Sequence, residues 1–178
     1  MISAVLRARA RSLDQIASTA GRPATAAAAW ARARSTAEII GAALDLPIRV
    51  DARFRERDAG DWTGLTRDEI EAGWPRYLAD HRRPGGFEHD RDVLARIIEG
   101  LVEVHATHPG ETVLIVSHGG VLRALERYCH DVDRAFPNVG GRIFELDGEG
   151  GTAGDLAITA GPRLFPLDDG QATYTTTP

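Results

Sequence analysis

Hydrophobic positions change their spacing several times along the chain, and the most informative change lies between residues 111 and 129. Thr112 to Val116 is an unbroken apolar, β-branched run, which predicts a strand buried on both faces in a parallel sheet. Ser117, His118 and two glycines end this run, and apolar residues then recur at helical spacing as far as Cys129. Ligands of such sheets bind at the carboxyl ends of strands, near the free amides of the next helix. His118 therefore stands where an anion is expected to bind.

The rest of the chain alternates between helical patterns, short strands and loops. Thr66 and Glu69 form a capping-box signature, so a helix is expected to begin there and to end near Trp74 and Pro75. Residues 54–66 and 80–91 have no regular period and are predicted to be loops. Further helices are predicted from Trp30 to a stop at Pro47 and from Val93 to a stop before Pro109. Strands are predicted over residues 2–6, 48–50, 142–146 and 156–159, the last of them at the edge of the sheet.

This alternation of helices and strands predicts an α/β fold with a mostly parallel sheet. The length of 178 residues is that of one domain able to bury a sizeable core. Within it, residues 1–29 are Ala-rich and weakly patterned, residues 30–160 carry the regular elements, and residues 161–178 are expected to form a loosely held tail.

Composition excludes several classes of partner and chemistry. The net charge of −5 gives no reason to expect nucleic acid or an anionic membrane, and no apolar run approaches 18 residues. The first residues carry arginines where a signal peptide would be apolar, so we predict a cytoplasmic protein. A single cysteine, Cys129, excludes an internal disulfide and a multi-cysteine zinc site. We expect neither a metal nor a cofactor.

All 21 basic residues are arginine, because the sequence contains no lysine. This excludes a P-loop phosphate grip and Schiff-base chemistry, both of which need a lysine. A phosphate group would have to be bound by arginine, histidine and backbone amides, and the planar guanidinium suits two phosphate oxygens at once.

Two further groups of charged residues are open to more than one interpretation. Arg32 and Arg34 lie near a predicted helix start, where the dipole disfavours cations, so one of them could be held there for an anion or both could simply be solvated. Glu56 lies in an acidic loop near Trp62, which favours either a desolvated general acid or a solvated surface loop. His81 and His89 are candidate substrate-facing groups in a polar loop, and His105 and His108 are interpreted as structural.

Four segments together carry a family resemblance, namely RARSTAEII (32–40), RFRERDAGDWTGLT (53–66), PGG (84–86) and VLIVSHGGVLRAL (113–125). Their order resembles the histidine phosphatase superfamily, the phosphoglycerate-mutase-like proteins, from about Arg32 to about Asn138. The resemblance implies a three-layer αβα sandwich and a reaction that passes through a phosphohistidine. It also implies that Arg32 clamps the phosphate, Glu56 is the general acid, His118 contacts the transferred phosphoryl group and the Gly119 amide is a further phosphate donor.

The chain departs from the family at the nucleophile. Family members open with a strand followed by Arg-His-Gly, whose histidine accepts the phosphoryl group, and this sequence contains no Arg-His-Gly. The nearest counterpart, VLRAR (5–9), has Ala8 in the place of that histidine, and the segment from there to Arg32 is shorter than is usual. We therefore expect the N-terminal part of the fold to be truncated or degenerate.

Three accounts follow from this departure. The chain could be an active enzyme that uses His81, His89 or His118 as acceptor, an inert relative that binds phosphorylated ligands or a partner, or an incomplete or altered version of an enzyme. Outside the family, it could be an anion-binding α/β domain that shares only the strand-glycine-helix unit. The short loop favours a phosphatase of small phosphorylated metabolites over a mutase, with hydrolysis impaired by the missing histidine. The sequence predicts no oligomeric state.

Overall fold

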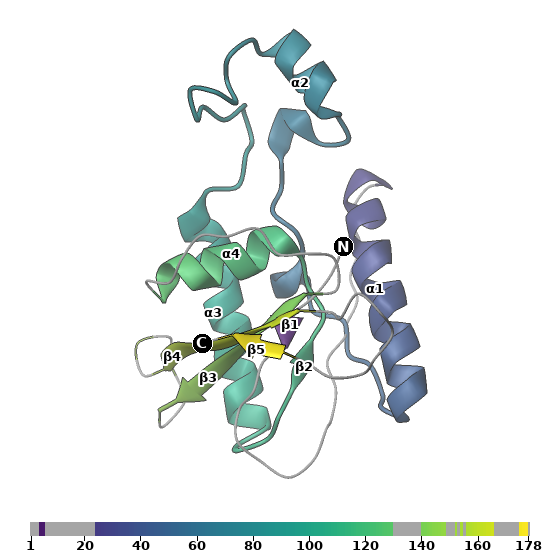
Figure 1. Cartoon of the computed structure of the whole chain (residues 1–178), viewed down its shortest axis with the longest axis vertical. Coiled ribbons are helices and arrows are strands. Elements are labelled where there is room, and N and C mark those ends of the chain that lie inside the picture. The colour runs from purple at the N-terminus through teal and green to yellow at the C-terminus, as the bar shows by residue number, and fades with distance from the viewer. Residues whose placement is uncertain are drawn as a thin grey trace.

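The computed structural model describes residues 4–5, 24–129, 140–148, 152, 154, 156–165 and 175–177, with side chains from residue 31 to residue 161 of these ranges. Figure 1 shows the order of the elements along the chain. The helices are α1 (Ala24–Leu44), α2 (Arg67–Gly73), α3 (Asp90–Thr107) and α4 (Gly119–Tyr128), with 3-10 turns η1 (Ala52–Phe54) and η2 (Gly60–Trp62). The strands are β1 (Ala4–Val5), β2 (Leu114–Ile115), β3 (Gly141–Asp147), β4 (Ala157–Phe165) and β5 (Thr175–Thr177).

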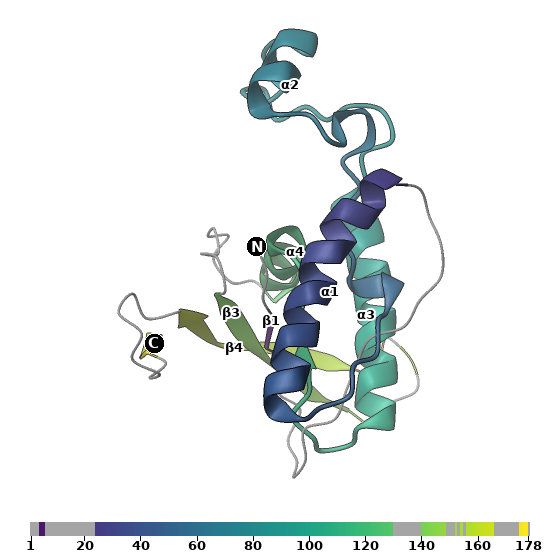
Figure 2. The same ribbon diagram turned by 90° about the vertical axis from the view of Figure 1, so that its right-hand side faces the viewer.

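The body of the molecule consists of α1, α3 and α4 around the strands, and one segment projects from it. Figures 1 and 2 show α2 and its flanking loops standing away from the body at one end. Trp62 packs edge-on against Trp74 and Phe87, with ring centroids 6.4 and 6.2 Å apart. Trp62 is only 7% exposed, so it forms the small core of this projecting segment.

Helical periodicity predicted α3 and a capping signature predicted the start of α2, whereas α1 begins at Ala24, before the predicted start at Trp30. In α3, Val93, Ile97, Leu101 and Val104 follow each other at intervals of three or four residues, and all four are buried in the hydrophobic core with Phe144 of β3. The capping box that begins α2 is present, with the Thr66 and Glu69 side chains each bonded to the other's backbone amide. These two helices therefore confirm the predictions made from local spacing.

The strands differ from the prediction in direction and position. In the described part of the chain β1 pairs with β2, β3 with β4 and β4 with β5, and all three pairs are antiparallel. The α/β class is confirmed, but the mostly parallel sheet is not, because an apolar run indicates burial and does not fix the direction of the neighbouring strand. The segment 48–50 is not a strand. The predicted edge strand 156–159 is part of β4, which lies between β3 and β5.

A buried ion pair fastens α4 to β3. Arg142 Nη1 lies 2.9 Å from Glu126 Oε1, and the two residues are 7% and 0% exposed. Both lie among apolar residues that pack α3 and α4 against the strands. The pair fixes the position of α4, and with it the turn that begins this helix.

Candidate functional site

His118 lies at the junction of β2 and α4, as the pattern of the sequence predicted. It is the N-cap residue of α4, and its carbonyl accepts hydrogen bonds from the amides of Val121 and Leu122 at 3.0 and 3.1 Å. The residue is 2% exposed. Next to it, the fully buried Ser117 donates from Oγ to the Phe54 carbonyl at 2.8 Å. This bond joins the turn at His118 to the loop that follows η1.

That loop brings Glu56 to His118. Glu56 Oε2 lies 3.9 Å from His118 Nδ1, and about a third of the Glu56 side chain is exposed. The contact depends on Gly120, because a Cβ there would lie 2.5 Å from Glu56 Oε1. A Cβ on Gly119 would meet nothing within 4 Å, so the space beside the Gly119 backbone is open to a ligand. The structure thus brings Glu56, His118 and Gly119 together.

The environment of His118 favours its neutral form. Burial is the largest influence and lowers its pKa below the ordinary value of 6.5, while the carboxylate of Glu56 acts in the opposite direction. The positive charges of Arg32 and Arg96 lower the pKa further.

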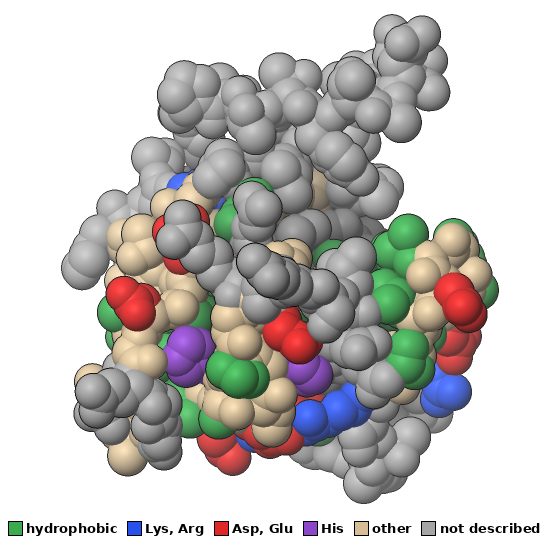
Figure 3. All heavy atoms as spheres, turned by 90° about the horizontal axis from the view of Figure 1, so that it is seen from below, with side chains coloured by type: hydrophobic (Ala, Val, Ile, Leu, Met, Phe, Trp, Pro, Cys, Tyr) green, Lys and Arg blue, Asp and Glu red, His purple; other side chains and the backbone are tan. Residues whose placement is uncertain are grey.

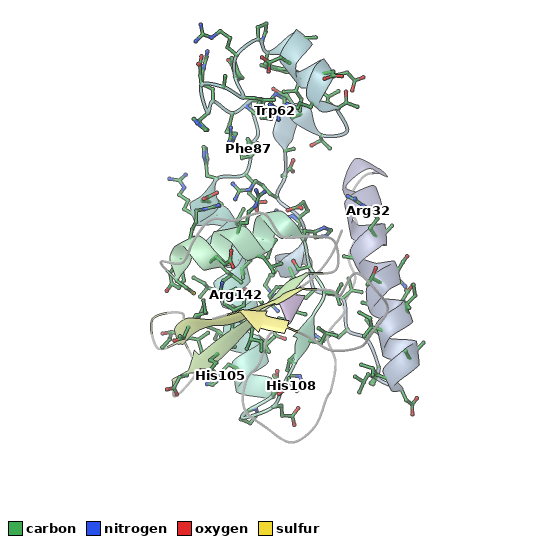
Figure 4. The ribbon with its side chains drawn as sticks, viewed as in Figure 1. Arg32, Trp62, Phe87, His105, His108 and Arg142 are labelled. Atoms are coloured by element: carbon green, nitrogen blue, oxygen red, sulfur yellow. The ribbon has the colours of Figure 1, made fainter. Side chains whose placement is uncertain are left out.

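Arg32 lies in α1, in the half of that helix nearer to the projecting segment (Figure 4). Its side chain is exposed, and no hydrogen bond or ion pair joins it to another residue in the described part of the chain. Arg34, two residues on, is instead bound to Glu38 at 2.7 Å. Of the two arginines considered from the sequence, Arg32 is thus the one available to an anion.

Arg96 of α3 holds the backbone around Glu56. Its guanidinium donates to the carbonyls of Arg53, Arg55 and Glu56 at 2.5, 3.0 and 3.4 Å, and to both oxygens of Glu88 at 2.7 and 2.9 Å. Sequence reasoning missed this group, because Arg96 stands beside the buried position Ile97 in an otherwise ordinary amphipathic pattern. Its partners lie 40 or more residues away in the sequence, apart from Glu88.

Glu88 is the acidic partner of this arrangement. Burial acts to raise the pKa of Glu88, but the hydrogen bonds from Arg96 and the Asp58 amide, with the charges of Arg96 and Arg55, hold it below the ordinary value. Asp58 N donates to Glu88 Oε2 at 3.0 Å. An ionised Glu88 therefore ties the loop that carries Glu56 to the start of α3.

A cleft of about 710 Å³ opens beside Glu56 and Gly120. It lies where the projecting segment meets the body, since Phe87, labelled in Figure 4 below Trp62, contributes to its wall. His89 also lines the cleft, whereas His81, the other candidate from the polar loop, does not. The remaining wall consists mainly of arginines, Arg57, Arg83, Arg123 and Arg127, with Asp90 between two of them.

The other two histidines considered from the sequence lie at the opposite end of the molecule from the projecting segment (Figure 4). Seen from that end, histidine side chains lie among acidic groups on the surface (Figure 3). His108 Nδ1 is 3.2 Å from Glu111, and His105 Nε2 is 3.0 Å from the Gly148 carbonyl. These contacts hold the end of α3 and agree with the structural interpretation of both residues.

Neither a metal site nor a membrane span is found among the described residues. Within them, no group of three or more His, Cys, Asp or Glu side chains is arranged to hold a metal ion. The helices of the same part of the chain are all too short or too polar to cross a bilayer.

Replacing Gly120 with alanine is expected to lower the pKa of His118 further. The new Cβ would displace the flexible Glu56 carboxylate, and His118 would lose the negative charge that stabilises its protonated form. An NMR titration of the His118 ring protons measures this change. Gly119→Ala is the matched control, because the space there is open and the pKa should stay as in the wild type. An unchanged pKa in Gly120→Ala would contradict the Glu56–His118 contact.

The fold and the site define an α/β protein with a buried histidine and a carboxylate 3.9 Å apart at the start of a helix. Comparison with known families places it more narrowly. Residues 6–152 match the histidine phosphatase superfamily (branch 1), and the chain belongs to this family. The resemblance noted from the sequence is confirmed.

Named relatives include phosphatases and mutases. The chain is 38% identical over 94 residues to an uncharacterized phosphatase, PhoE, of Bacillus subtilis, covering 53% of this chain and 46% of that protein. It is 36% identical over 107 residues to glucosyl-3-phosphoglycerate phosphatase of Mycobacterium tuberculosis, covering 53% and 48%. It is 36% identical over 106 residues to a 2,3-bisphosphoglycerate-dependent phosphoglycerate mutase of Nitrobacter winogradskyi, covering 53% and 51%. The chain thus spans about half the length of these curated relatives.

Solved structures share the fold. The mycobacterial glucosyl-3-phosphoglycerate phosphatase in complex with VO3 aligns with a TM-score of 0.60 and 26% identity, covering 72% of this chain and 70% of that one. The same phosphatase in complex with inorganic phosphate aligns with a TM-score of 0.58 and 27% identity, covering 73% and 70%.

Proposed function

We propose that this chain binds the phosphoryl group of small phosphorylated metabolites between His118, Arg32 and the Gly119 amide. In this account it is a phosphatase whose hydrolysis is impaired because its sequence lacks the Arg-His-Gly histidine. The observation that carries the proposal is the buried His118 at the start of α4, with Glu56 at 3.9 Å and the charge of Arg32 acting on it. Family membership supports it, as do the phosphate and vanadate complexes of the mycobacterial relative.

The chemistry of phosphoryl transfer fits these residues. Negative charge on the equatorial oxygens must be neutralised, which Arg32, His118 and the amides at the helix start can do without a metal. The leaving oxygen needs a proton, and Glu56 lines the cleft next to His118, where it can supply one. A helix N-terminus adds a favourable dipole for the bound anion.

The acceptor of the phosphoryl group is the part of the reaction for which this sequence lacks the family's Arg-His-Gly histidine. The position of Ala8, the counterpart of the family nucleophile, lies outside the described residues. His89 lines the cleft that contains Glu56, so it is the alternative acceptor that the geometry favours over His81. An inert relative that keeps only the phosphate site is the second candidate function, and the missing Arg-His-Gly favours it.

The remaining expectations belong to the same proposal. We propose a three-layer arrangement of helices around the sheets, residues 30–160 as the phosphoglycerate-mutase-like domain, and action on soluble metabolites in the cytoplasm. The substrates and partners of the whole protein are part of the proposal too, since the relatives are about twice the length of the matched region.

Arg32→Ala is expected to weaken vanadate binding by roughly 2 kcal/mol or more, the usual scale for a charged hydrogen-bond donor. Isothermal titration calorimetry with vanadate measures the loss. Arg34→Ala is the matched control, because Arg34 lies on the same helix and is bound to Glu38. Equal affinities for Arg32→Ala and the wild type would remove Arg32 from the site.

Glu56→Gln is expected to change vanadate binding little and to reduce any hydrolysis of p-nitrophenyl phosphate by about a hundredfold or more, the scale of a lost general acid. The glutamine keeps the shape of the side chain but cannot donate an acidic proton. Glu71→Gln, on the exposed face of α2, is the control. Hydrolysis at the wild-type rate in Glu56→Gln would show that Glu56 is not the acid.

A further inference from the structure

The backbone just before the acidic side chain of the site is bound from two sides. Arg96 of α3 donates to the carbonyls of Arg53 and Arg55 at 2.5 and 3.0 Å. The carbonyl between them, that of Phe54, accepts instead from Ser117 Oγ at 2.8 Å. Successive carbonyls of this segment are thus bound alternately to α3 and to the turn between β2 and α4. A segment bound in both directions has little freedom to move toward either neighbour.

The Phe54 ring packs directly on the backbone of α3. A Cβ at Gly100 would lie 2.7 Å from Phe54 Cζ and 3.0 Å from Cε2, so a side chain at position 100 fits only if the ring moves. The ring belongs to the hydrophobic core, and Phe54 is 7% exposed. Because protein interiors are closely packed, a displaced ring has to move the backbone that carries it. Gly100 therefore determines how closely this segment approaches α3.

Ser117 connects the same segment to the histidine of the site. The residue is 0% exposed, and it directly precedes His118, the N-cap residue of α4. On the other side of the hydrogen bond, Glu56 follows Phe54 by two residues, and its Oε2 lies 3.9 Å from His118 Nδ1. The acid and the histidine are thus joined through a buried hydrogen bond that lies within two residues of each of them.

We propose that Ser117 and Gly100 are positioning residues, which together set the distance between Glu56 and His118. Ser117 holds the Phe54 carbonyl beside the turn at His118, and Gly100 determines where the Phe54 ring lies against α3. The consequence for catalysis rests on the proposed function, in which Glu56 protonates the leaving oxygen of a phosphoryl group bound at His118. Misplacing a reacting group by about 1 Å can cost about a hundredfold in rate.

The test measures the electrostatic interaction between Glu56 and His118. The Glu56 carboxylate raises the pKa of His118, so an NMR titration of the His118 ring protons is expected to give a lower pKa in Glu56→Gln than in the wild type. The same substitution is then made in Ser117→Ala and in Gly100→Ala. In these two backgrounds the shift caused by Glu56→Gln is expected to fall to about half or less, because the interaction of two charges weakens with distance and with access of water.

Two further variants make the test specific. Thr107→Val is the matched control for serine, because Thr107 Oγ1 also donates to a backbone carbonyl, that of Glu103 at 2.7 Å, but at the far end of α3. This background should keep the full shift. Adding Phe54→Leu to Gly100→Ala removes the ring atoms that the new Cβ would meet, and most of the shift should return. Such a rescue separates an effect on position from a general loss of stability.

A full shift in both the Ser117→Ala and Gly100→Ala backgrounds would overturn this inference and leave the proposed function standing. A shift that falls as much in Thr107→Val as in Ser117→Ala would contradict it as well, and so would a wild-type His118 pKa that does not respond to Glu56→Gln. If the pKa values behave as expected but the wild type binds no inorganic phosphate, the positioning role stands and the proposed function is wrong.

Discussion

His118→Ala is expected to abolish any hydrolysis of p-nitrophenyl phosphate by this chain and to weaken vanadate binding by about 3 kcal/mol, the upper range for a charged hydrogen-bond partner. His118 is buried at the start of α4, where it lies 3.9 Å from Glu56 and where the charge of Arg32 lowers its pKa. A bound phosphoryl anion would stabilise the protonated imidazole, whose pKa burial otherwise lowers. Rates measured from pH 5 to 8 follow the hydrolysis, with acid-labile protein phosphate assayed on the same samples, and calorimetry with vanadate follows the binding.

The comparison needs a variant that keeps the volume of the side chain. His118→Gln fills most of the space and lacks a group that protonates in this pH range, so it is expected to lose hydrolysis as His118→Ala does. Hydrolysis at the wild-type rate in either variant would mean that the reaction occurs elsewhere. A phosphohistidine trapped in the wild type would show that a histidine of this chain accepts the phosphoryl group, and peptide mapping would test whether it is His81, His89 or His118.

Arg142→Met is expected to reduce the free energy of unfolding by about 3–5 kcal/mol. The substitution leaves the Glu126 carboxylate buried at 0% exposure without the guanidinium that lies 2.9 Å from it. Because the pair joins α4 to β3, the loss should also lower phosphate affinity at the start of α4. Urea unfolding followed by circular dichroism measures the stability.

Two comparisons make this prediction specific. Arg34→Met breaks an exposed ion pair with Glu38 at a similar distance, 2.7 Å, and is expected to cost less than about 1 kcal/mol. The double variant Arg142→Met with Glu126→Leu removes both buried charges and should recover most of the loss. A single Arg142→Met variant as stable as the wild type would contradict the structural role given to the pair.

The features that sequence could predict are those determined by neighbouring residues. Thr66 and Glu69 satisfy each other's amides across one helical turn, so the start of α2 follows from four residues. The change from an apolar run to glycines and then to helical spacing likewise placed His118 at a strand end. The family motifs added the roles proposed for Glu56 and Arg32, which their local patterns left open.

The features that sequence did not predict depend on contacts between distant segments. The antiparallel pairing of β4 with β5 joins residues of β4 to Thr175–Thr177, a stretch with no apolar pattern. Because of this pairing, β4 is the middle strand of a three-stranded sheet and not the edge strand that was predicted. Arg96 reaches carbonyls of the loop around Glu56, and the cleft collects arginines from three segments. No local pattern identifies such groupings, because each residue alone resembles an ordinary surface arginine.

The central claim is that His118 and Arg32 bind one phosphoryl group together, and a double-mutant cycle on vanadate affinity tests it most directly. Calorimetry on the wild type, Arg32→Ala, His118→Ala and the double variant gives the coupling energy between the two side chains. The account predicts that the wild type binds vanadate. It also predicts that the loss of binding free energy in the double variant is smaller than the sum of the two single losses, by about 1 kcal/mol or more. Strictly additive losses, or a wild type that binds no vanadate, would contradict it.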